Sequence, residues 1–146
     1  MITLNPSLGF ENQTREALEF YREALGGQIH LVTYADYAAA DPSAEVAKEH
    51  HDRIVHGVLL TEFGQRIIAA DTLEPAPKTP AVTLSIWGSP EDVDTLRAAF
   101  TRLAVGGAVT VAFDVASWAA DETWGALTDK FGVYWEFGTH PAGSYL

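Results

Sequence analysis

Hydrophobic and polar positions along the chain recur with two periods, one typical of helices and one typical of strands. From Thr14 to Leu25 the apolar residues follow the spacing of a single buried stripe, which predicts a helix. Asn12 or Thr14 can cap the start of this helix. Gly26 and Gly27 can end it, because glycine accepts the left-handed conformation of a C-terminal cap.

A second helix is predicted after Ser89. Ser89 can cap it, Pro90 suits its first position, and the two acidic residues that follow favour the positive end of the helix dipole. The apolar face continues to Leu103, and the pair Gly106-Gly107 stops the helix.

Shorter segments that are rich in β-branched and aromatic residues predict strands. These segments are Ile2–Phe10, Gln28–Tyr34, Arg53–Thr61, Arg66–Asp71, Ala81–Trp87, Val109–Val115, Trp124–Thr128 and Val133–Gly138. The polar, Ala-rich stretch from Ala35 to Asp52 is expected to be a loop with room for a short helix. Asp71 and Asp129 follow strands and are expected to be turn residues.

The same order of elements occurs twice: strand, helix, Gly-Gly, strand and a Phe-Gly hairpin. Gly26 and Gly106 are 80 positions apart, whereas the hairpin glycines Gly64 and Gly132 are 68 apart. An insertion between the second and third strands of the first half explains the difference. The repeat predicts an α+β fold of two βαβββ modules that form a curved mixed sheet, with both helices on one face.

The expected organisation is a single domain made of two modules. The first module spans 1–71, a proline-rich linker spans 72–80, the second module spans 81–138, and 139–146 form a tail. The face of the sheet away from the helices must be shielded from water. Either the sheet curves around a cavity or two chains pair through this face. A cavity is where a ligand is expected to bind.

Charge and composition narrow the classes of function. Nine basic and 20 acidic residues give a net charge of −11, which disfavours binding to nucleic acid and to anionic membranes. The chain has no cysteine, which excludes disulfides and thiolate chemistry. Because no signal peptide or membrane-spanning run is seen, a cytoplasmic location is expected.

Four motifs resemble the PhnB-like branch of the vicinal-oxygen-chelate superfamily, a branch often labelled by similarity to a demethylubiquinone methyltransferase. They are Asn5–Phe10, Glu16–Tyr21, Leu25–Gly27 and Trp124–Trp135. The superfamily includes glyoxalase I, extradiol dioxygenases and bleomycin-resistance proteins. The resemblance implies a homodimer whose cavity is built from paired modules. It also implies, in the metal-using relatives, a divalent cation held by His and Glu.

The ligand positions of that metal site fall mostly on residues that cannot coordinate. They are Pro6 or Asn5, Ile68 or Ala69, Ala81 and Glu136. Only Glu136 is a suitable ligand, and a catalytic metal needs roughly three protein ligands. We therefore predict no metal cofactor.

The histidines offer little evidence for a metal site of another kind. The cluster of His50, His51 and His56 is predicted to belong to a solvated loop, because adjacent histidines on an extended chain point to different sides. His30 and His140 are isolated in the sequence and receive no role.

Alternation along the strands selects the candidate site residues. If Trp135 and Phe137 pack under the helix, then Tyr134 and Glu136 face the concave side, as do Thr83 and Ser85 on the strand 81–87. The candidate ligand-binding residues are Tyr134, Thr83, Ser85 and Trp124. Trp87 and Trp118 can also line an aromatic pocket, and each tryptophan can instead belong to the core or an interface.

Two residues are candidates for acid–base chemistry. Glu136 can act as a general base or a polar anchor, or it can pair with Arg53 or Arg66 or lie in water at the cavity mouth. His56 can be an acid, a base or a ligand anchor, but its apolar neighbours favour a buried structural histidine.

Three functions remain open. The first is a protein that binds a small, largely apolar or aromatic molecule in a metal-free cavity. The second is an isomerase or lyase type of enzyme, with Glu136 as the base and with or without a recruited metal. The third is a module whose only role is association.

Overall fold

The computed structural model describes residues 5–73, 82–117 and 119–141. The chain divides into two compact units, Met1–Lys78 and Thr79–Leu146. Of the expected linker, 72–80, all but the first two residues lie outside the described residues, as do Ile2–Leu4, Ala81, Trp118 and most of the expected tail.

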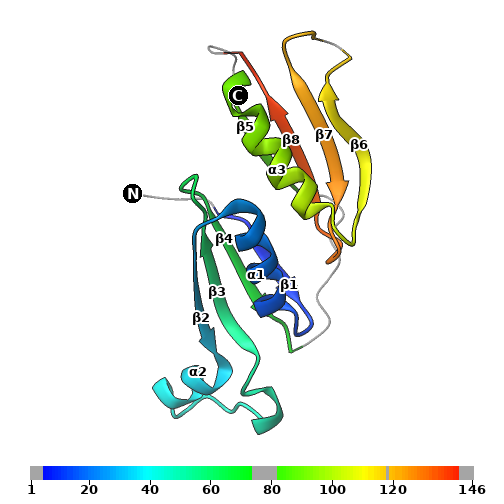
Figure 1. Cartoon of the computed structure of the whole chain (residues 1–146). Helices are drawn as coiled ribbons and strands as arrows, with labels where there is room; N and C mark the ends of the chain where they lie inside the picture. Colours follow the sequence, from blue (N-terminus) through cyan, green and yellow to red (C-terminus); the bar gives the residue numbers. More distant parts are fainter. Residues whose placement is uncertain (1–4, 74–81, 118, 142–146) are drawn as a thin grey trace. The chain divides into compact units, whose positions relative to one another are not determined.

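The first unit is a four-stranded mixed sheet with a helix against it (Figure 1). Its elements are β1 (Ser7–Phe10), α1 (Thr14–Leu25), β2 (Gln28–Thr33), α2 (Tyr34–Ala40), the 3₁₀ turn η1 (Lys48–His50), β3 (Ile54–Leu60) and β4 (Arg66–Asp71). The strand order is β1-β4-β3-β2. β1 runs parallel to β4, and the other pairs are antiparallel.

The second unit repeats this architecture. Its elements are β5 (Thr83–Gly88), the 3₁₀ turn η2 (Pro90–Asp92), α3 (Val93–Leu103), β6 (Ala108–Val115), β7 (Thr123–Thr128) and β8 (Tyr134–Thr139). The strand order is β5-β8-β7-β6, with β5 parallel to β8 and the other pairs antiparallel. The predicted α+β class and the duplicated βαβββ order are confirmed, and each unit holds its own four-stranded sheet.

The insertion predicted in the first unit consists of α2, η1 and the segments around them. Figure 1 shows α2 beyond the ends of β2 and β3. The start of α2 is held by reciprocal hydrogen bonds: Asp36 N–H donates to Thr33 Oγ1 at 3.1 Å, and Thr33 N–H donates to Asp36 Oδ2 at 2.9 Å. This segment replaces the short connection between β6 and β7, so the two glycine spacings differ.

The repeated glycine pairs have a role beyond ending the helices. A Cβ at Gly27 would lie 1.9 Å from the carbonyl oxygen of Leu60, and a Cβ at Gly107 would lie 2.2 Å from that of Thr128. Leu60 and Thr128 end β3 and β7, and they are 68 positions apart, as the hairpin glycines are. Each unit therefore needs a glycine where the chain leaves the helix and passes close to the end of its third strand.

Each core lies between one helix and one face of its sheet. In α1 the buried stripe contains Ala17, Leu18, Tyr21 and Leu25, as the spacing predicts. In the second unit, Phe100 of α3 contacts Phe113 of β6 and meets the ring of Phe137 of β8 edge-on at 5.6 Å. The opposite face of each sheet faces away from its helix.

The start of α1 differs from the prediction. Neither Asn12 nor Thr14 caps it; instead, the Asp71 carboxylate at the end of β4 accepts the N–H groups of both residues, at 3.1 and 3.0 Å. The other oxygen of Asp71 accepts Ile54 N–H at 2.8 Å. Asp71 is 3% exposed and is a buried structural residue, not the turn residue that the sequence predicts. Asp129 does occupy a turn as expected, although it is equally buried.

The second helix begins with a tighter turn than predicted. Ser89 lies at the N-cap position as predicted, and Asp92 Oδ2 accepts both its N–H and its hydroxyl group at 2.9 Å. Pro90 then starts the 3₁₀ turn η2, and the α-helical part begins at Val93. Among the described residues, no helix is long and apolar enough to cross a membrane.

Candidate functional site

One face of the second sheet collects most of the predicted site residues. Leu84, Trp135 and Phe137 are buried on the side of α3, so their neighbours along the strands lie on the other side. We call this second side the open face. Thr83 pairs with Tyr134, and Ser85 pairs with Glu136, across the parallel strands β5 and β8.

The Glu136 carboxylate has a defined partner on the open face. Ser85 Oγ donates to Glu136 Oε2 at 3.1 Å, and both residues are at least partly exposed. The Ser85 hydroxyl thus orients the Glu136 carboxylate. The second carboxylate oxygen, Oε1, can accept a hydrogen bond from a ligand.

Two tryptophans flank a glycine near one end of the open face. Gly138 of β8 pairs with Trp87 of β5 on one side and with Trp124 of β7 on the other. A Cβ at Gly138 would lie 2.0 Å from Cζ3 of Trp87, so the indole ring occupies the space that a side chain at 138 would fill. The three positions form an aromatic strip across three strands.

Two residues beyond Gly138 the chain has His140, to which the sequence analysis gave no role. His140 stacks on Trp87, with ring centroids 4.1 Å apart and planes at 9°. Its Nδ1 lies 3.3 Å from Oε1 of Glu122, and the two side chains are 13% and 18% exposed. The available signal was alternation, because Glu136, Gly138 and His140 are spaced two apart. The predicted strand end at Gly138 removed His140 from that pattern.

His56, the other candidate for acid–base chemistry, belongs to the first unit. It lies on β3 of the first unit, opposite Val32 of β2, and it is exposed. The buried structural histidine favoured by its apolar neighbours is therefore wrong. The period-two pattern explains the exposure, because Gly57 and Leu59 face α1 while His56 and Val58 face the other side.

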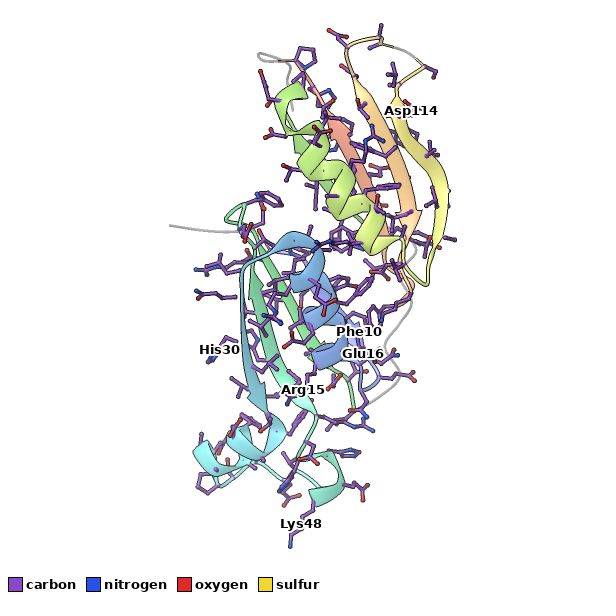
Figure 2. All side chains as sticks on the ribbon, in the orientation of Figure 1. Phe10, Arg15, Glu16, His30, Lys48 and Asp114 are labelled. Atoms are coloured by element: carbon purple, nitrogen blue, oxygen red, sulfur yellow. The ribbon has the colours of Figure 1, made fainter. Side chains whose placement is uncertain are left out.

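The other histidines of the first unit make local contacts. His50 Nε2 lies 3.8 Å from the exposed carboxylate of Glu49, and His51 lies 3.3 Å from the carbonyl oxygen of Val46. Figure 2 shows His30 on β2 and Asp114 on β6, which are the outer strands of their sheets.

The donor set does not fit the metal site of the metal-using relatives. Ile68 of β4 and Glu136 of β8 occupy equivalent places in the two repeats, and the side chain of Ile68 offers no donor atom. Within 5–73, 82–117 and 119–141, no three His, Asp or Glu side chains are grouped closely enough to hold a metal ion. Glu136 has Ser85 beside it, and a hydroxyl is a poor substitute for a histidine.

Comparison with known proteins agrees with the architecture. The family model described as 3-demethylubiquinone-9 3-methyltransferase matches residues 3–137. The chain is also similar to the crystal structure of protein PA1353 from Pseudomonas aeruginosa, with 26% identity and a TM-score of 0.78. That match covers 97% of this chain and 99% of the other.

Two further structures show the same fold. One is a putative 3-demethylubiquinone-9 3-methyltransferase, PhnB protein, from Bacillus cereus, with 22% identity and a TM-score of 0.68 over 95% of this chain and 100% of that one. The other is a glyoxylase/bleomycin resistance protein/dioxygenase domain from Frankia sp. EAN1pec, with 16% identity and a TM-score of 0.57 over 99% and 96%. The resemblance that the sequence motifs carry is confirmed.

Proposed function

Because the chain belongs to the PhnB-like family described as 3-demethylubiquinone-9 3-methyltransferase, we propose that it binds a small planar molecule on the open face of its second sheet, without a resident metal ion. The observation that carries the proposal is the aromatic strip of Trp87, Gly138 and Trp124 beside the Ser85–Glu136 pair. Ligand sites typically combine such apolar surface with a few oriented polar groups.

The chemistry of the open face favours one kind of ligand. Indole rings stack on planar groups, and a carboxylate accepts from O–H or N–H groups. The Glu136 carboxylate and the net charge of −11 disfavour anions. The ligand we propose is therefore a neutral aromatic or conjugated molecule that carries at least one hydrogen-bond donor.

A matched pair of probes tests this proposal. 2-Naphthol offers a planar ring and an O–H group, whereas 2-methoxynaphthalene offers the ring alone. We expect calorimetry to show that the wild-type protein binds 2-naphthol more tightly. We expect Glu136→Gln to weaken 2-naphthol binding about fivefold, since a charge-assisted hydrogen bond becomes a neutral one.

The control is Glu45→Gln, which removes an exposed carboxylate of the first unit and should leave both affinities unchanged. If the wild-type protein binds neither probe, the proposal is wrong. Tight binding of both probes with no effect of Glu136 would leave the apolar surface as the ligand site and remove the polar anchor.

A second candidate function is proton transfer by Glu136 in an isomerase or lyase. It is favoured by one observation: Ser85 holds Oε2 of the carboxylate, which fixes its orientation for taking a proton. An enzyme of this kind would exchange an acidic C–H of its ligand for deuterium in heavy water. Loss of that exchange in Glu136→Gln, with binding retained, would separate catalysis from binding.

We also propose that the protein is a cytoplasmic homodimer, as the resemblance to the PhnB-like branch implies. Sedimentation equilibrium of the full chain should give twice the mass of 15.8 kDa. A monomer over the same concentration range would contradict this proposal without affecting the ligand site. A dimer that binds neither probe would instead favour a module that serves association alone.

A further inference from the structure

Ala126 is surrounded by larger side chains on the open face. Gly125 and Leu127 are buried, so Ala126 lies on the side of β7 that faces away from α3. Its neighbours on that side come from β8, β6 and β7 itself, and each has a larger side chain than a methyl group: Glu136, Val111, Trp124 and Thr128. The surface of the open face is therefore lower at Ala126 than at these neighbours.

The spacing of the strands sets the size of a molecule that can lie over Ala126. Trp124 and Thr128 are four residues apart on β7, which corresponds to about 13 Å along the strand. Val111 and Glu136 lie on the two strands that flank β7, about 10 Å apart. The side chains at these positions reduce both dimensions. A flat molecule of two fused rings matches the area that remains.

The two ends of β7 differ in polarity on the open face. Trp124 lies at one end, in the aromatic strip. At the other end Thr128 pairs with Tyr134, and Tyr134 pairs with Thr83, so three hydroxyl groups form a row across β7, β8 and β5. The Tyr134 side chain is 46% exposed. Among the described residues, none of the three hydroxyls has a hydrogen-bond partner. We call these three positions the hydroxyl row.

The Glu136 carboxylate lies between the two ends. Tyr134 is two residues before Glu136, about 7 Å along β8. A molecule that lies over Ala126 and donates to Glu136 therefore has one end next to the hydroxyl row. The hydroxyls of threonine and tyrosine both donate and accept, so they can bind a hydroxyl or a carbonyl group at that end. A carboxylate is disfavoured there by Glu136 and by the net charge of −11.

We propose that Ala126 is the floor of the ligand site and that the hydroxyl row selects the ligand. The ligand is a flat, elongated molecule of two fused rings. It carries a hydrogen-bond donor beside Glu136 and a second, neutral polar group at the end near Tyr134 and Thr128. This inference rests on the proposed function and names the class of its ligand.

A matched pair of probes tests the hydroxyl row. 6-Hydroxymethyl-2-naphthol and 6-ethyl-2-naphthol have nearly the same size, and they differ only in the second polar group. Calorimetry should show that the wild-type protein binds the first probe about fivefold more tightly, the effect of one neutral hydrogen bond. Tyr134→Phe and Thr128→Val each remove one hydroxyl and should reduce this preference, without weakening the binding of 6-ethyl-2-naphthol.

Tyr37→Phe is the matched control for Tyr134→Phe. Tyr37 lies on α2 of the first unit and is 42% exposed, close to the value for Tyr134. The same chemical change at this position should leave the affinities for both probes unchanged. No preference in the wild-type protein, or a preference that persists in both Tyr134→Phe and Thr128→Val, would overturn the role of the hydroxyl row.

A larger side chain at position 126 tests the floor of the site. Ala126→Leu should weaken the binding of both probes about tenfold or more, because the added side chain takes the place of the rings. Ala39→Leu makes the same change at an exposed position of α2 and should have no effect. If Ala126→Leu does not fold, Ala126→Val, which suits a strand, replaces it. Binding by the folded variant that equals or exceeds that of the wild type would contradict this placement of the ligand.

The outcomes separate this inference from the proposed function. A wild-type protein that binds 2-naphthol through Glu136, but shows neither the preference for 6-hydroxymethyl-2-naphthol nor an effect of Ala126→Leu, would keep the proposed function and reject the inference. A wild-type protein that binds none of the probes would reject both.

Discussion

The carboxylate of Asp71 accepts a hydrogen bond of 3.0 Å from the backbone N–H of Thr14, which lies 57 residues earlier in the chain. The bond joins the end of β4 to the first turn of α1, where backbone N–H groups have no partner within the helix. The equivalent place in the second unit holds Thr139, whose hydroxyl accepts Thr123 N–H at 3.1 Å. A side chain at the end of the last strand thus secures the fold of each unit.

Replacing Asp71 should destabilise the protein strongly. Asp71→Ala leaves the N–H groups of Asn12, Thr14 and Ile54 without their acceptor, and we expect a loss of about 3 kcal/mol of unfolding free energy. Asp71→Asn should cost less, because one amide oxygen can still accept. Urea unfolding followed by circular dichroism measures both. Asp94→Asn, at an exposed position of α3, is the control, and an equally small effect of Asp71→Ala would refute the role.

Replacing Asp129 should also destabilise the protein, for a related reason. One of its oxygens accepts the N–H groups of Phe131 and Val133, and the other accepts Nε1–H of the buried Trp135 at 2.9 Å. Asp129→Asn must turn its amide group toward one of these donors, so we expect a loss of about 2 kcal/mol. In a double-mutant cycle, Asp129→Asn should cost less in the Trp135→Phe background. Strictly additive losses would show that the indole bond contributes nothing.

Gly138 should tolerate a methyl group only when Trp87 is absent. In the wild-type protein a Cβ at this position meets the indole ring, so Gly138→Ala should displace the ring and weaken 2-naphthol binding about tenfold. In the Trp87→Ala background the methyl group has room, and Gly138→Ala should add little further loss of stability. Equal losses of stability in the two backgrounds would mean that Trp87 does not occupy this space.

Asp36 and Asp92 should titrate at unusually low pH. Hydrogen bonds from the backbone and side chain of Thr33 lower the pKa of Asp36 from 3.8, and those from Ser89 do the same to the pKa of Asp92. A lowered pKa in the folded state means that the caps stabilise the fold above pH 3.8, and that this stabilisation is lost as the pH falls through the lowered values. Carboxyl ¹³C titration should give midpoints below 3.8 for both residues.

Thr33→Val and Ser89→Ala supply the control for that titration. Each removes the side-chain donor and keeps the backbone one, so the midpoint of its own partner should rise partway while the other stays low. Midpoints at or above 3.8 in the wild-type protein would contradict the cap geometry.

Local patterns were sufficient to predict most of the fold. The bounds of α1 follow from the spacing of its apolar residues and from the glycines after it, and the structure confirms Thr14–Leu25. The duplicated order of elements also follows from local features, because helix ends and hairpins have their own residue signals. The placement of Thr83, Ser85, Tyr134 and Glu136 on one face follows from strand alternation alone.

What the sequence did not reveal depends on contacts between distant residues. The cap of α1 comes from Asp71, and nothing near Thr14 indicates it. The Glu122–His140 pair depends on the register of β7 with β8, and the expected strand end at Gly138 hid it. His56 was misjudged because apolar neighbours in a strand lie on both faces, so they do not indicate burial of the residue between them.

The most direct measurement of the central claim is a backbone and indole ¹H–¹⁵N shift map of the full chain during titration with 2-naphthol. The ligand site predicts that the largest changes fall on the open face, at Ser85, Trp87, Trp124 and Glu136, with a clear change at His140. Changes that concentrate on Leu84 and Phe137 at the α3 side, or on the strands of the first unit, would contradict a ligand site on the open face of the second sheet.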